Sequence, residues 1–140
     1  YGYCQIGYPV LDKNGYTDPS TENRWMISPN FMFASRVSSS TDKVDFWAAV
    51  SRCKNYSETD TDGVTYTGWR MPTYAEMLLL DILQNVSKSE IKEITDRHRY
   101  WTADPASNSA FRILNPSGGT NGENASYAEV RCVRDIDRPL

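Results

Sequence analysis

The order of apolar repeats along the 140 residues constrains the fold more than any other feature. A first amphipathic helix follows a polar loop that ends at Asp42, a residue suited to the N-cap, and its i, i+3, i+4, i+7 stripe comprises Phe46, Ala49, Val50 and Cys53. A second helix opens with the capping box Thr73–Glu76. Its predicted buried stripe is Leu79, Ile82, Leu83 and Val86, widened by Leu78 and Leu80.

Strand patterns follow the helices, at residues 99–103, 110–114 and 127–134. The turn-forming run 116–122 separates the last two and predicts an antiparallel hairpin or meander. In the final strand Ala128, Val130 and Cys132 share one face, while Tyr127, Glu129, Arg131 and Val133 share the other. Two helices followed by a small antiparallel sheet is an α+β order, unlike the alternation of a parallel doubly wound fold.

The remaining segments are less regular. Residues 1–24 read as loop with a turn at Asn14-Gly15, and residues 24–28 and 31–36 look strand-like. Residues 55–67 are polar and acidic and predict an exposed loop. Within it Asp60-Thr61-Asp62-Gly63 resembles a fragment of a calcium loop, but the further spaced acidic ligands are missing, so a solvated turn is favoured.

Length and charge exclude several classes of protein. A chain of this length suits a single domain, which we assign to residues 1–140 with its core at about 25–135. The net charge of −3 argues against a nucleic-acid partner. The longest apolar run, residues 46–50, is far short of the roughly 20 residues of a membrane-spanning helix. Because the chain starts at Tyr1, we expect a processed form or a piece of a longer protein.

Three cysteines and one histidine offer no metal-binding pattern. Cys4, Cys53 and Cys132 lack the close pair spacing of a zinc or redox motif, and His98 is alone. We therefore expect neither a metal nor a cofactor. Spacing alone leaves two readings open for the cysteines, reduced and buried or joined in a disulfide.

Four motifs in a fixed order carry a resemblance to a known family. They are the helix ending at Cys53, the run Trp69-Arg70-Met71-Pro72-Thr73-Tyr74-Ala75-Glu76, the strand Tyr100-Trp101-Thr102, and the terminal Val130-Arg131-Cys132-Val133-Arg134. This set resembles the bacterial branch of the C-type-lectin-like superfamily and covers about residues 44–134. The run 25–35 also resembles segments of surface and fimbrial-tip adhesins of Bacteroidales-type bacteria.

The resemblance implies a C-type-lectin-like fold in which Cys53 pairs with Cys132, leaving Cys4 over. A disulfide implies an oxidising location, so the domain is expected outside the cell, on the surface or a fimbrium associated with the outer membrane. Trp69 and Trp101 could stack on a sugar, but they stand in motifs of this resemblance, so core packing is favoured for both. Arg70 could contact a ligand, but an arginine beside a capped helix is more often a structural donor. The sequence lacks the Glu-Pro-Asn and Trp-Asn-Asp motifs of calcium-dependent lectins, so calcium-dependent sugar binding is not implied.

A binding role without catalysis is the expected function. His98 with Glu93 or Asp96 has no accompanying nucleophile motif, so no catalytic residue is assigned. In lectin-like folds the region matching residues 104–127 forms the recognition surface, and its Asn- and Ser-rich composition suits adaptable hydrogen bonding. The ligand would be a cell-surface glycan or protein. The candidate ligand-binding residues are Tyr66, Asn108, Arg112, Asn121, Asn124 and Tyr127.

A structural role is the alternative to adhesion. The domain would then dock with other fimbrial subunits or cap their assembly, and the polar hairpin would be ordinary solvated surface.

Overall fold

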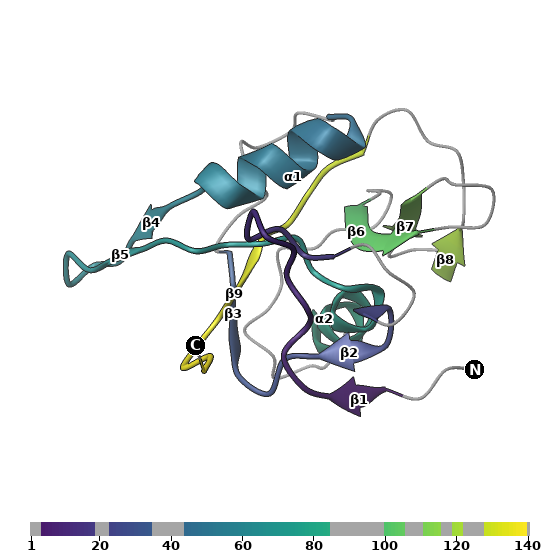
Figure 1. Ribbon diagram of the computed structural model, residues 1–140, viewed down its shortest axis with the longest axis horizontal. Coiled ribbons are helices and arrows are strands. Elements are labelled where there is room, and N and C mark those ends of the chain that lie inside the picture. Colours follow the sequence, from purple (N-terminus) through teal and green to yellow (C-terminus); the bar gives the residue numbers. More distant parts are fainter. Residues whose placement is uncertain are drawn as a thin grey trace.

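The computed structural model describes residues 4–18, 23–34, 44–84, 100–105, 111–115, 119–121 and 128–139. Two helices, α1 (Phe46–Asn55) and α2 (Tyr74–Gln84), lie among small separate sheets (Figure 1). The described strands are β1 (Gln5–Ile6), β2 (Met26–Ile27), β3 (Phe31–Phe33), β4 (Glu58–Thr59), β5 (Thr65–Tyr66), β6 (Tyr100–Pro105), β7 (Phe111–Asn115), β8 (Gly119–Asn121) and β9 (Val133–Asp135). This is the mixed α+β class that the sequence predicts.

Helix α1 confirms the first predicted stripe. Its buried residues are Phe46, Ala49, Val50 and Cys53. The N-cap is Asp45, whose carboxylate accepts a hydrogen bond of 2.7 Å from the backbone N–H of Ala48. The predicted N-cap Asp42 lies outside the described residues. The basic residues Arg52 and Lys54 occupy the last turn, where they complement the negative end of the helix dipole.

Helix α2 begins with the predicted capping box, but its buried face agrees with the prediction only in part. The Thr73 N–H donates to Glu76 Oε1 at 2.9 Å, and the Glu76 N–H donates to Thr73 Oγ1 at 3.2 Å. The predicted buried stripe was right for Leu80, which is buried, but wrong for Ile82, which is 62% exposed, and it missed the buried Met77. Predicted stripe member Val86 lies outside the described residues. Glu76 is fully buried, as are its neighbours Met77 and Leu80, so the buried face of α2 includes a carboxylate that is paired with Arg70.

The first two predicted strands pair antiparallel as β6 and β7, but the third strand of the sheet is β8. The predicted pairing of residues 110–114 with the final strand was wrong, because β9 pairs with β3. Strand β8 lies inside the run 116–122 that the sequence assigned to a turn. Strands β7 and β8 pair Ile113 with Asn121 and Asn115 with Gly119. The connection between these two strands is therefore shorter than the turn predicted over residues 116–122.

The final strand is shorter than predicted and buried on both faces. Only residues 133–135 form β9, which pairs with β3, although isolated bridges join Ala128 to Val44 and Glu129 to Tyr100. All residues from 128 to 133 are buried. Other segments therefore cover both of the faces that the alternation predicts.

The amino-terminal segments contribute short pairings to separate sheets. Strand β1 pairs in parallel with β2, whereas β3 belongs with β9. The predicted turn at Asn14-Gly15 is present, and Gly15 has a φ of 81° that favours glycine.

Residues 55–67 form a hairpin of β4 and β5 and not the predicted loop. In Figure 1 it projects from the body beyond the end of α1. At its tip, Asp60 Oδ1 accepts the backbone N–H groups of Asp62 and Val64, both at 2.9 Å, and Gly63 has a φ of 83°. The carboxylate of Asp60 therefore stabilises the turn, in agreement with the turn reading.

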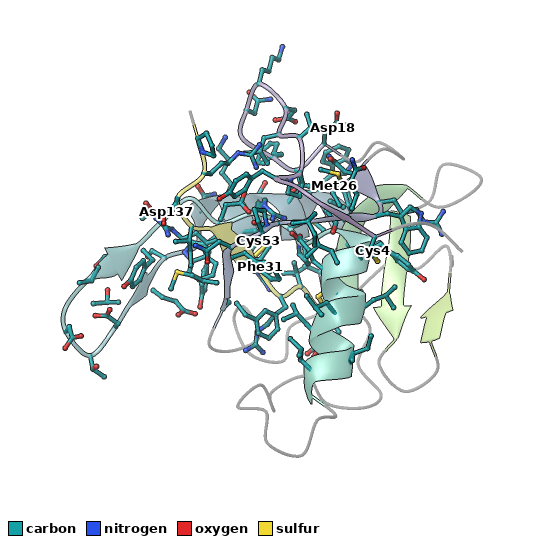
Figure 2. All side chains as sticks on the ribbon, turned by 90° about the horizontal axis from the view of Figure 1, so that it is seen from below. Cys4, Asp18, Met26, Phe31, Cys53 and Asp137 are labelled. Atoms are coloured by element: carbon teal, nitrogen blue, oxygen red, sulfur yellow. A yellow bond between two sulfur atoms is a disulfide. The ribbon has the colours of Figure 1, made fainter. Side chains whose placement is uncertain are left out.

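The main core lies between α1 and the carboxy-terminal run. The predicted core tryptophans, Trp69 and Trp101, are only 2% and 3% exposed. A disulfide joins Cys53 of α1 to Cys132, with a Cα–Cα distance of 5.4 Å, and confirms the pairing implied by the resemblance. Figure 2 shows Cys53 within the body and labels Cys4, which is a free, exposed cysteine. None of the helices formed by the described residues is long and apolar enough to cross a membrane.

Candidate functional site

A buried network of charges fixes the region where α2, β9 and the chain end meet. Arg70 donates to both carboxylate oxygens of Glu76, at 2.7 and 2.8 Å, and to both of Asp135, at 2.8 and 3.1 Å. Arg138 approaches Asp135 from the surface at 3.0 Å. Arg70 is 3% exposed and Glu76 is fully buried. This confirms the predicted structural role of Arg70, since its donors are directed at carboxylates within the protein.

The network shifts the ionisation of its members. Burial alone would lower the pKa of Arg70, but its pairs with Glu76 and Asp135 outweigh this effect and raise that pKa. Burial alone would raise the pKa of Asp135. Hydrogen bonds from Arg70, Ser28 and Arg138 outweigh it, so this carboxyl has a lowered pKa. Both shifts favour the charged forms that the ion pairs require.

We expect Asp135 to make the fold sensitive to acid. Because its folded pKa lies below the unfolded value of about 3.9, its stabilisation is complete above that pH and is lost as the pH falls through the folded pKa. Asp135→Asn should therefore unfold more easily at neutral pH and show a flatter loss of stability below about pH 4. Urea midpoints measured from pH 7 to pH 2 test this, with exposed Asp62→Asn as control; equal slopes for wild type and Asp135→Asn would refute it.

Beside this network lies an open groove with a volume of about 380 Å³. It lies between the carboxy-terminal end of α1, the segment that follows β5, and β9 with the residues after it. Basic residues outnumber acidic ones in its lining, although the chain as a whole has a net negative charge. The lining residues are Leu11, Gly15, Lys54, Thr67, Gly68, Trp69, Arg70, Arg134, Asp135 and Arg138.

Aromatic rings hold two of the groove's cations in place. The Lys54 Nζ lies 4.6 Å from the ring centre of Tyr16, and the Arg134 guanidinium lies 5.4 Å from that of Tyr66. Arg134 Nε also donates to the Thr67 carbonyl. The Tyr66 hydroxyl donates to Asp60 Oδ2 at 3.1 Å, and this bond raises the pKa of Tyr66. The β4–β5 hairpin and the groove are thus joined through one stacked pair.

The sequence-predicted site residues fall into two separate places. Arg112 and Asn121 lie on β7 and β8, which are neighbours in one sheet. Tyr66 lies on β5, which Figure 1 places on the opposite side of the body from that sheet. The other candidates, Asn108, Asn124 and Tyr127, lie outside the described residues, as do His98, Glu93 and Asp96.

Sequence reasoning did not find the groove. Lys54, Arg134 and Arg138 are separated by up to 84 positions in the chain, and no motif links them. The disulfide between Cys53 and Cys132 places the end of α1 near β9, so the cations that follow the two cysteines in sequence line the same groove. The available signal in the sequence was the basic residue shortly after each cysteine of the disulfide, Lys54 after Cys53 and Arg134 after Cys132.

Comparison with known proteins gives one relationship. No protein-family model matches the chain. It is similar to the major fimbrium tip subunit FimD of Porphyromonas gingivalis, with 28% identity over 152 aligned positions that include 92% of this chain. A second FimD sequence from that species gives the same values. The chain spans 22% of the length of these curated relatives. The similarity relates the chain to a fimbrial protein.

Proposed function

We propose that the chain is a non-catalytic, C-type-lectin-like binding domain of a fimbrial-tip or cell-surface adhesin. The observation that carries this proposal is the similarity to a fimbrium tip subunit over 92% of the chain. As one part of a longer surface protein, the domain acts outside the cell, on a fimbrium or the outer membrane. Its partners are a glycan or protein on another surface and the neighbouring fimbrial subunits.

The architecture supports the lectin-like part of the proposal. The disulfide connects the last turn of α1 to the carboxy-terminal run, as the family resemblance implies. The box before α2 is held by Arg70, Thr73 and Glu76, which join it to the end of the chain through Asp135. Such a rigid frame is suited to presenting variable loops without itself contacting a ligand.

The ligand surface in this proposal is the segment 104–127, which includes strands β7 and β8. The paired strands β7 and β8 place Arg112 and Asn121 on adjacent strands of one sheet. Asn108, Asn124 and Tyr127 belong to the same stretch of sequence. Polar side chains displayed from a strand scaffold recognise ligands through adaptable hydrogen bonds.

Glycan arrays and pull-downs from cell-surface extracts, both with the oxidised chain, test the proposal. We expect a specific ligand, and we expect the triple change Arg112→Ala, Asn121→Ala, Tyr127→Ala to lower its affinity by roughly tenfold or more, since a hot-spot contact is worth at least that factor. Asn55→Ala, at the exposed end of α1, is the matched control. A folded, oxidised chain that captures no ligand in either assay contradicts the adhesin role.

A docking or capping role in a fimbrial assembly is the second candidate, and the projecting β4–β5 hairpin favours it. Val64 on this hairpin is 48% exposed and would face a subunit that docks there. If the hairpin docks with a neighbouring subunit, Val64→Asp should reduce the recovery of fimbrial subunits with the chain, whereas Val64→Thr should not. Normal adhesion with the triple change above, combined with lost subunit recovery for Val64→Asp, would decide for this role.

A further inference from the structure

Two cations of the groove have no carboxylate partner among the residues that the structure describes. Arg70 and Arg138 share Asp135, and Arg70 is also paired with Glu76. Lys54 and Arg134 contact aromatic rings and, for Arg134, a backbone carbonyl and the Met32 sulfur. These neutral contacts position the two charges without neutralising them, so the groove keeps an excess of positive charge.

Both cations are held before any ligand arrives. The rings of Tyr16 and Tyr66 hold the charged ends of Lys54 and Arg134, which reduces the side-chain entropy that an anion would otherwise remove on binding. A guanidinium has five N–H donors, and those of Arg134 are only partly used by the Thr67 carbonyl and Met32 Sδ. A preorganised donor with unused N–H groups is what recognition of a carboxylate or sulfate requires.

The groove between these cations is open and chemically mixed. Gly68 has a φ of 79°, and a Cβ built there would meet no atom within 4 Å, so bare backbone lines this part of the groove. The apolar residues Trp69 and Leu11 and the hydroxyl-bearing Thr67 complete the wall. Its volume of about 380 Å³ is at the lower end of the range for small-molecule sites.

We infer that this groove binds an acidic sugar through its carboxylate or sulfate, with Lys54 and Arg134 as the anion-binding residues. Arg138 at the rim, bound to Asp135, adds a third cation. A sugar ring matches the mixture of hydroxyl, backbone and apolar surface. An extended acidic peptide fits less well, because peptide binding along a strand uses a sheet edge or a long groove.

The inferred site differs from the ligand surface of the proposed adhesin. Figure 1 places β5 and β9 on one side of the molecule and the sheet β6-β7-β8 on the other. The inference therefore does not depend on residues 104–127, and either site can fail experimentally while the other stands.

NMR titration of the oxidised chain with methyl β-D-glucuronide, methyl β-D-glucoside, inorganic sulfate and hexaglutamate tests the inference. We expect the glucuronide to shift the backbone amide signals of residues 67–69 and 134, and the neutral glucoside to shift them far less. The double change Lys54→Gln, Arg134→Gln should lower glucuronide affinity by roughly tenfold or more, and rising salt should weaken it. Lys13→Gln, an exposed lysine outside the groove lining, should leave affinity unchanged.

Each other result overturns the inference in a defined way. Equal binding of glucuronide and glucoside would exclude anion recognition, and equal binding of sulfate and glucuronide would exclude recognition of the sugar. Tighter binding of hexaglutamate with the same dependence on Lys54 and Arg134 would assign the groove to an acidic protein partner. Absence of binding to wild type, or equal loss with Lys13→Gln, would remove the site altogether. Variant spectra that keep wild-type dispersion establish that the fold is intact.

Discussion

Glu76→Gln is expected to lower the free energy of unfolding by about 3 to 5 kcal/mol, the usual cost of breaking a buried ion pair from one side. Each carboxylate oxygen of Glu76 accepts two hydrogen bonds. Oε1 accepts from Arg70 Nη1 and the Thr73 N–H, and Oε2 accepts from Arg70 Nη2 and the Ser28 N–H. A glutamine amide nitrogen at either position would face two donors and accept neither. The substitution keeps the shape of the side chain, so the loss arises from unpaired charge and unsatisfied donors.

Urea denaturation of Glu76→Gln, Arg70→Met and the double variant measures this effect. The double variant should lose less than the sum of the single losses, because removing both charges avoids leaving one buried and unpaired. Asp62→Asn, which removes an acidic charge on the exposed hairpin tip, should remain within about 0.5 kcal/mol of wild type. A Glu76→Gln protein as stable as this control would show that the network does not support the fold.

Reduction of the Cys53–Cys132 bond should lower the free energy of unfolding by a similar amount. The bridge joins positions 79 residues apart, and the chain-entropy model gives about 4 to 5 kcal/mol for a loop of that length, within the 2 to 5 kcal/mol measured for small domains. Since whole domains are stable by only about 5 to 15 kcal/mol, the reduced chain should unfold at a much lower urea concentration.

Urea unfolding with and without reductant measures the contribution of the disulfide bond separately from that of the packing around the two cysteines. Both cysteines are fully buried, so a Cys53→Ala, Cys132→Ala protein loses core contacts as well as the bond and should be less stable than the reduced wild type. Cys4→Ala should match wild type, because Cys4 is exposed and unbridged. Identical midpoints for the oxidised and reduced chain would contradict the predicted contribution of the bond.

The sequence predicted the local features that depend on neighbouring residues. The stripe of α1 repeats on one face, and the capping box of α2 needs only Thr73 and Glu76, so both were correctly predicted. The inward face of α2 was predicted only in part, because hydropathy treats a glutamate as outward-facing. Here Arg70, which precedes the helix by a few residues, compensates the buried charge, and the helical periodicity does not include that partner.

Predictions failed where distant segments surround one run of chain. Residues 128–133 alternate in polarity, yet Glu129 and Arg131 are as buried as Val130 because Val44, Ala34 and Tyr100 contact the run from different sides. The groove has the same origin, since its cations come from α1 and β9. Of the predicted site residues, Tyr66 stacks on a groove cation, while the role of residues 104–127 stays a prediction.

The central place of residues 128–135 has a consequence for the order of folding. This run bonds with Ala34, Val44, Arg70 and Trp101, and it supplies one half of the disulfide. In the amino-to-carboxyl order of synthesis, this run follows every one of these partners. Contacts of such long sequence separation also slow folding. The interior between α1 and this run therefore closes only after residues 128–135 have been synthesised.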